Sequence, residues 1–135
     1  MKSSVTLKHN MHFVGDLDGF DIPLDAGAVF GGRSKGPGPK GLMLTALAGC
    51  TAMDVISLLR KMEQEPEHFS VETEADVAGE HPRVFTAVRL VYRLKGDLDR
   101  EKVEKAVRLS QERYCGVNAM LKKAAPVSYR IVIDP

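Results

Sequence analysis

The chain has 135 residues, a formal net charge of +1 and 27% charged residues. That length suits a single domain spanning residues 1–135, and the near-neutral balance excludes a protein that binds nucleic acid or an anionic membrane by bulk electrostatics. No apolar run approaches the roughly 18–20 residues of a membrane span and the first residues lack a signal-peptide core, so we expect a cytoplasmic protein.

Residues 1–38 are predicted to form strands followed by a glycine-rich loop. Residues 3–8 alternate polar and apolar side chains, and residues 11–14 continue that strand or begin the next one. Residues 16–19 are typical of a hairpin turn, with 20–24 as the return strand. Residues 26–41 are rich in glycine but lack the pattern of a phosphate-binding loop. We expect them to form a mobile flap over a pocket.

Residues 39–135 are predicted to hold the helices and the remaining strands. From about residue 42 to 62, apolar side chains cover nearly every face of a helix, which predicts burial on all sides. Residues 69–77 and 84–94 favour an antiparallel hairpin. Asp97 or Asp99 is the expected cap of the next helix, which runs towards Tyr114. A short helix over 117–123 and a strand over 127–133 complete an α+β fold with antiparallel sheet.

Two cysteines stand 65 positions apart, at Cys50 and Cys115. Cys50 lies in the apolar helix, where it is either an inert core residue or a nucleophile that needs a compensating charge to ionise. Asp54 follows one turn later, as an orienting group or as a solvated position. Cys115 begins a helix, where the dipole and free backbone donors can activate a thiol. A disulfide between the two requires Cα atoms within about 7 Å.

Three cations are candidates for activating Cys50: Arg33 and Lys40 within the glycine-rich segment, and Arg83 in the turn before residue 84. Metal binding is not expected. The four histidines include one close pair, His9 and His12, and no cysteine lies near them in sequence. A structural zinc site usually draws its ligands from two close-set pairs.

Three segments in order, residues 38–57, 81–86 and 106–118, resemble the OsmC/Ohr family of thiol peroxidases, in particular its OsmC-like, YhfA-type branch. The resemblance runs from about residue 20 to the C-terminus. It implies an OsmC-like α+β fold, with antiparallel sheets wrapped around long central helices in an intertwined homodimer. It also implies that Cys50 attacks a peroxide and that Cys115 resolves the sulfenic acid to a disulfide. An external dithiol would then reduce the protein, without metal, haem or flavin.

One feature of the classical peroxidases in that family is missing. They place a Glu about nine or ten residues before the first cysteine and pair it with an Arg from the N-terminal strands. Here those positions hold Lys40 and Gly41, and no Arg precedes Arg33. The leading hypothesis is a reductase of organic hydroperoxides or related oxidants. The alternatives are a redox sensor without turnover, a small-molecule-binding protein of the same fold, and a dimeric domain with inert cysteines.

Overall fold

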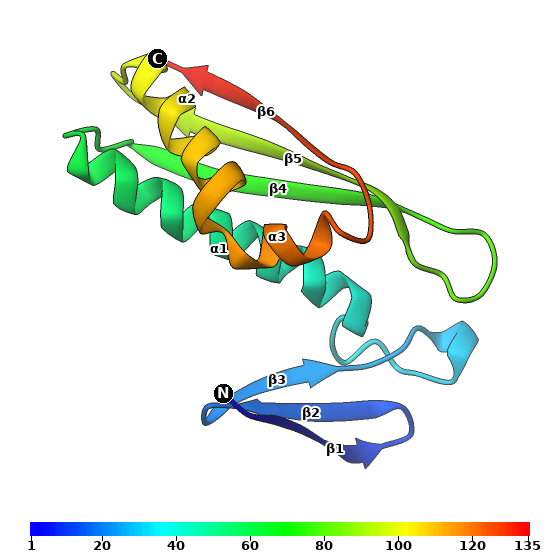
Figure 1. The fold of residues 1–135 in the computed structure, drawn as a ribbon. Coiled ribbons are helices and arrows are strands. Elements are labelled where there is room, and N and C mark those ends of the chain that lie inside the picture. Colours follow the sequence, from blue (N-terminus) through cyan, green and yellow to red (C-terminus); the bar gives the residue numbers. More distant parts are fainter. The chain divides into compact units, whose positions relative to one another are not determined.

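The computed structural model describes all residues from Met1 to Pro135 and divides them into two compact units, Met1–Met43 and Leu44–Pro135. The elements follow in the order β1, β2, β3, α1, β4, β5, α2, α3, β6 (Figure 1). The predicted mixture of helices and two small sheets is confirmed. The division between the units lies inside α1 (Pro39–Lys61).

The first unit is built on an antiparallel meander of β1 (Ser3–His9), β2 (His12–Leu17) and β3 (Phe20–Leu24). Asp18 and Gly19 form the predicted hairpin turn, with φ angles of 53° and 87°. Positive φ at both central residues gives the turn a twist that matches the flanking strands. The Asp16 carboxylate accepts a hydrogen bond from the Gly19 N–H at 3.0 Å, which stabilises the turn further.

A buried carboxylate organises the glycine-rich segment after β3. Backbone N–H groups of Ala26, Arg33 and Lys35 donate to the Asp25 carboxylate at 2.7, 3.4 and 3.0 Å. Burial opposes ionisation, but these donors hold the pKa of Asp25 below its usual range. Gly32 closes the same loop, because a Cβ there would overlap the Ala26 carbonyl oxygen. The segment is therefore held together by hydrogen bonds of its own backbone, and its role as a flap stays a prediction.

The second unit contains a three-stranded sheet in the order β4 (His68–Val77), β5 (Phe85–Lys95), β6 (Val127–Asp134). β4 and β5 form the predicted antiparallel hairpin. β6, however, pairs with β5 in parallel, so the expectation of a purely antiparallel sheet was wrong. The physical reason is the helical connection between them, since a crossover through helices returns the chain in the same direction.

The core of this unit lies between one face of the sheet and the helices. Val88, Leu90, Tyr92 and Leu94 alternate along β5 and are at most 1% exposed. They pack with the buried side of α1 and with α2 (Arg100–Leu109), both of which lie over that face (Figure 1). A π-helical segment, Ser110–Tyr114, follows α2 directly and leads to α3 (Gly116–Leu121).

Within one chain, α1 is buried on one face only. Leu47, Thr51, Val55 and Leu59 recur every four residues and are fully buried, whereas Met53 is 73% exposed. The expectation of burial on every side is therefore not met by the single chain. The helix is also long and apolar enough to cross a membrane, contrary to the prediction that no run approaches that length. The core helix of a soluble protein passes the same test, and here one face packs on the sheet.

Candidate functional site

The two cysteines meet in the second unit although they are far apart in sequence. Cys50 is half-buried in the middle of α1, and Cys115 is 3% exposed at the start of α3. Their Sγ atoms and a carboxylate oxygen of Asp54 all lie within 4.8 Å of one another. Both cysteines are free thiols. A disulfide between them would require the two sulfur atoms to approach to about 2.0 Å.

Asp54 belongs to this cluster and is not a solvated surface position. It lies one helical turn after Cys50, on the same side of α1. Its Oδ2 accepts a hydrogen bond of 2.9 Å from the Ser110 hydroxyl, at the beginning of the π-helical segment. Asp54 thus joins the helix that carries Cys50 to the segment that leads to Cys115.

A chain of buried hydroxyls continues from Asp54 into the core. Ser110 Oγ lies 2.7 Å from Thr51 Oγ1, which lies 2.7 Å from the Tyr92 hydroxyl. Gln111 Nε2 donates to the same Tyr92 oxygen at 2.6 Å. Ser110 gives its only proton to Asp54, so Thr51 must donate to Ser110 and Tyr92 to Thr51. Every hydroxyl proton in the chain therefore points towards the Asp54 carboxylate.

The far end of this chain returns to Cys115. Asn118 Nδ2 donates to the Gln111 Oε1 and backbone oxygens at 2.8 and 2.9 Å. The backbone N–H of the same Asn118 donates to Cys115 Sγ at 3.4 Å. Asn118 is 1% exposed, and its Oδ1 is a buried acceptor without a partner. Asn118 therefore connects the second thiol to the same buried network.

Burial governs the acidity of Cys115. Burial raises the pKa of this thiol to about 11, and the nearby Cys50 and Asp54 contribute to the rise. The hydrogen bond from the Asn118 N–H lowers the pKa but does not offset these effects. Activation of Cys115 by its place at a helix start, as the sequence suggested, is therefore outweighed. At neutral pH, Cys115 is a protonated thiol.

The three predicted activating cations lie in separate parts of the chain. Arg33 is exposed in the glycine-rich segment, where its backbone N–H binds Asp25. Lys40 lies in the first turn of α1, ten residues before Cys50. Arg83 is exposed in the connection between β4 and β5. The charged side chain that the structure brings to both thiols is instead Asp54. The roles of the three cations stay predictions.

Five polar residues of the site were missed by the sequence analysis: Thr51, Tyr92, Ser110, Gln111 and Asn118. Each is buried, and together they come from α1, β5, the π-helical segment and α3. The only sign of these five residues in the sequence is that each is polar at a position where the periodicity predicts a core residue. Such residues are common in ordinary cores, so no single position identified the network.

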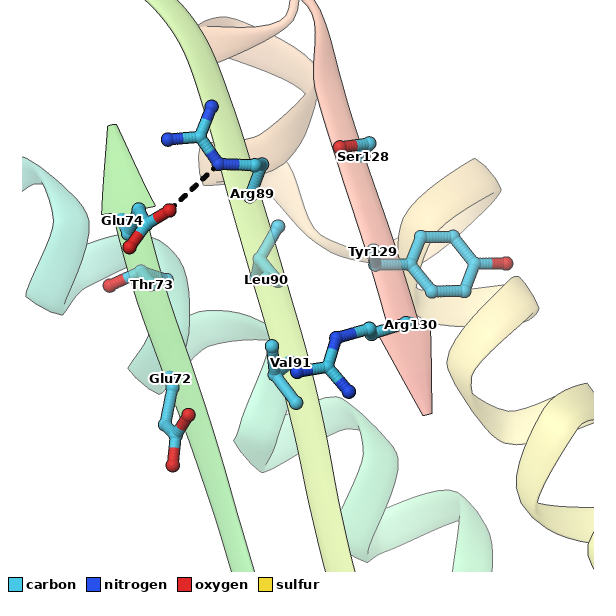
Figure 2. Close-up of a pocket in the computed structure, with 9 residues that line it drawn as sticks. All are labelled: Glu72, Thr73, Glu74, Arg89, Leu90, Val91, Ser128, Tyr129 and Arg130. Carbon is cyan, nitrogen blue, oxygen red and sulfur yellow. Dashed lines mark hydrogen bonds and ion pairs between the residues drawn. The ribbon is translucent and has the colours of Figure 1, made fainter. Parts of the chain in front are cut away.

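A separate open pocket lies on the other face of the sheet and holds neither cysteine. It has a volume of about 460 Å³ and is lined by residues of β4, β5 and β6, including Glu74, Arg89 and Arg130 (Figure 2). Arg89 donates to Glu74 at 2.9 Å and to Asp76 at 2.8 Å, so its charge is already paired. The pocket contains no cysteine, so the dithiol cluster is the candidate site.

Comparison with known proteins gives consistent matches over nearly the whole chain. A family model described as OsmC-like protein matches residues 32–130. Protein YhfA of Escherichia coli strain K12 is 35% identical over 136 residues, covering 98% of each chain. A hypothetical protein from Aquifex aeolicus VF5 is 24% identical with a TM-score of 0.83, covering 99% of this chain and 97% of that one. The organic hydroperoxide resistance protein OhrB of Bacillus subtilis is 21% identical with a TM-score of 0.69, covering 96% of each.

Proposed function

This chain belongs to the OsmC-like protein family, as the resemblance in its sequence predicted, and on that premise we propose that it reduces organic hydroperoxides or related oxidants through its two thiols. The observation that carries the proposal is the approach of Cys50 Sγ, Cys115 Sγ and the Asp54 carboxylate to within 4.8 Å. Cys50 is the nucleophile, and Cys115 is the resolving thiol. The name of the structurally similar OhrB agrees with this chemistry.

The order of the two thiols is supported by their different surroundings. Cys50 is half-buried and therefore more open to a peroxide than Cys115. Cys115 is nearly inaccessible, and burial raises its pKa to about 11, which makes it a poor first nucleophile. A resolving thiol needs no access to solvent, because its partner is the sulfenic acid already formed on Cys50.

The proposed reaction has two internal steps. The Cys50 thiolate attacks the O–O bond, its sulfur becomes a sulfenic acid, and the alkoxide that leaves takes up the thiol's former proton to become an alcohol. Cys115 sulfur then displaces hydroxide from the sulfenic acid, and the proton of Cys115 converts that hydroxide to water. Asp54 lies close enough to both sulfur atoms to carry the proton in each step. An external dithiol reduces the disulfide by exchange and needs no metal, haem or flavin.

The same proposal includes the oligomeric state of the protein, its location in the cell and the cations that assist Cys50. We expect a homodimer, because Met43 and Met53 on α1 are 45% and 73% exposed and a second chain would cover them. We expect it in the cytoplasm, where reducing systems keep both thiols ready. Arg33, Lys40 and Arg83 are candidates for attracting the oxidant or activating Cys50.

The test is a peroxide titration of the reduced protein, followed by intact mass and thiol counting. Cumene hydroperoxide should remove both thiols and about 2 Da per chain, and dithiol should reverse the change. Cys50→Ser should abolish peroxide consumption. The matched variant Cys115→Ser should still form a sulfenic acid, trapped by dimedone, without forming the disulfide. Unchanged peroxide consumption in Cys50→Ser would contradict the proposal.

The missing Glu before Cys50 favours a second candidate function, a redox sensor or small-molecule-binding protein with weak or no turnover. Lys40 and Gly41 occupy those positions, so the usual Glu–Arg couple is absent. A sensor forms the disulfide once but does not consume peroxide catalytically when a dithiol reductant is abundant. The rate of peroxide loss under excess dithiol therefore separates the two functions.

A further inference from the structure

The reduced dithiol cluster has the donor atoms and spacing of a metal site. Two thiol sulfurs and a carboxylate oxygen, from Cys50, Cys115 and Asp54, all lie within 4.8 Å of one another. From this arrangement we infer that the reduced protein binds one zinc ion between these three side chains. The proposed peroxidase chemistry does not require such an ion. The amino-acid pattern did not predict one either, because no two of these ligands form a close-set cysteine or histidine pair.

The ligands come from two elements that hold them in suitable directions. Cys50 and Asp54 are four residues apart in α1, the spacing by which helices present two metal ligands on one face. Cys115 approaches from the start of α3. Zinc binds thiolate at about 2.3 Å and carboxylate at about 2.0–2.2 Å, so donor atoms around a tetrahedral ion are about 3.5–3.8 Å apart. Closing a separation of 4.8 Å to that range requires a shift of about 1.0–1.3 Å.

The carboxylate and one of the two thiols already accept hydrogen bonds from neighbouring residues, and such bonds orient metal ligands. Ser110 donates to Asp54 Oδ2 at 2.9 Å. The Asn118 backbone N–H donates to Cys115 Sγ, as N–H groups commonly do to coordinated thiolates. Ligands held in this way lose little freedom when an ion binds, and removing such partners typically weakens metal affinity 10–100-fold.

The donor set selects the class of ion. Oxygen-seeking Mg²⁺ and Ca²⁺ disfavour thiolates, whereas Zn²⁺ accepts sulfur and carboxylate ligands together. Three protein ligands leave the fourth tetrahedral position to water or an external thiol. Cys50 and Asp54 are both half-buried rather than sealed, which gives an ion a route to the cluster.

Zinc and oxidation compete for the same sulfur atoms, a consequence that rests on the proposed function. The zinc-bound dithiolate, one hydroperoxide and two protons give the disulfide, an alcohol, water and free Zn²⁺. The two electrons come from the sulfur atoms, and the metal is not oxidised. An occupied site should therefore slow oxidation of the dithiol, and the disulfide form should not bind the ion.

The experiment is a zinc titration of the reduced, metal-free protein under nitrogen, in competition with a chromogenic chelator. We expect one Zn²⁺ per chain, lost in Cys50→Ser and Cys115→Ser and weakened at least about tenfold in Asp54→Asn. Ser110→Ala should weaken binding about 10–100-fold. Asp97→Asn, which removes an exposed carboxylate in the loop after β5, is the matched control and should leave affinity unchanged. Circular dichroism of each variant checks that it is folded.

Cobalt identifies the ligands independently of affinity. Co²⁺ in this site should show sulfur-to-metal charge-transfer absorption together with the visible bands of a tetrahedral ion. The strand pair that brings His9 opposite His12 is the alternative site, and binding there would show no sulfur band. Zinc binding that survives Cys50→Ser, or that persists in the disulfide form, would overturn the inference.

Failure of this inference is distinguishable from failure of the proposed function. Disulfide formation is measured on metal-free protein with chelator present, where zinc plays no part. A protein that forms the disulfide but binds no zinc keeps the proposed function and contradicts the metal site. A protein that binds zinc through both thiols yet ignores peroxide supports the metal site and contradicts the peroxidase.

Discussion

At the scale of single residues, burial has a larger effect on the pKa of Cys115 than its position at the start of a helix. Its place at the start of α3 and the Asn118 N–H both favour a thiolate. Removal from water favours the neutral thiol more strongly and raises the pKa to about 11. The α3 helix is only six residues long, so its dipole is weak. The result is a thiol that favours its protonated form and is a weak nucleophile at neutral pH.

The reactivity of Cys115 should therefore depend steeply on pH. In Cys50→Ser, which leaves Cys115 as the only thiol, alkylation by iodoacetamide should be slow at pH 7. It should accelerate as the pH rises towards 11, because a raised thiol pKa delays thiolate formation to higher pH. Mass spectrometry of quenched samples gives the rate at each pH. Rapid alkylation at pH 7 in a folded variant would contradict the assigned role of burial.

The Tyr92 hydroxyl is the central member of the buried chain, and its removal should be costly. Tyr92→Phe leaves Gln111 Nε2 without its acceptor and Thr51 without its donor, with an expected loss of about 1–3 kcal/mol in the free energy of unfolding. Urea denaturation measures the loss. Tyr129→Phe is the matched control: its ring packs edge-on against Tyr92 at 5.8 Å, but the residue is 42% exposed. We expect that control to stay within about 0.5 kcal/mol of the parent.

At the scale of elements, the start of α2 distinguishes two aspartates that the sequence left as alternatives. The Asp99 carboxylate accepts from the N–H groups of Glu101 and Lys102 at 2.9 and 3.4 Å, whereas Asp97 is exposed in the preceding loop. Asp99 is therefore the N-cap. α2 leads directly into the π-helical segment, so its start determines where Ser110 and Gln111 lie.

Removing this cap should destabilise the protein by about 1 kcal/mol, the usual cost of replacing an N-cap Asp with Ala. Asp99→Ala should lower the denaturation midpoint accordingly, and Asp97→Ala, two residues earlier, should have almost no effect. Urea unfolding of the two variants side by side makes the comparison. Equal effects of both changes would contradict the assignment of Asp99 as the cap.

At the scale of the whole molecule, the proposed homodimer accounts for apolar surface that one chain leaves open. Met53 on α1 is 73% exposed, and Val5 and Leu7 on β1 are 56% and 55% exposed. A helix this apolar is stable in water only when its open side is covered. A second copy of the chain is the partner that the family resemblance predicts.

A charge on the open side of α1 should therefore separate the dimer. We expect Met53→Asp to sediment as a monomer, or to aggregate through the uncovered surface, at concentrations where the parent is a dimer. Arg108→Asp, on the exposed side of α2, is the control and should leave the dimer intact. Analytical ultracentrifugation gives the oligomeric state. A parent protein that is monomeric at all concentrations would contradict the proposal directly.

The secondary structure was largely predictable because its signals are local. The turn at Asp18 and Gly19 and the β4–β5 hairpin each depend on residues close together in the sequence. So does the long helix, which was expected from about residue 42 and begins at Pro39. The same holds for the helix break at Cys115. The family resemblance also rested on short segments in a fixed order, and the matches over nearly the whole chain confirmed it.

The family resemblance implied that Cys50 and Cys115 pair, but the residues themselves did not show which distant positions lie together, and the tertiary structure decided this. The approach of Cys115 to Cys50, the parallel pairing of β6 with β5 and the hydrogen-bond chain through Tyr92 all join residues distant in sequence. No local pattern specifies such contacts. The type of a residue indicates which backbone conformation it favours and whether it tends to be buried, but it does not indicate which distant residue it will contact. The amino-acid sequence by itself thus determined the elements and the two candidate thiols. Packing of α1 and the π-helical segment over one sheet determined that those thiols share a site with Asp54.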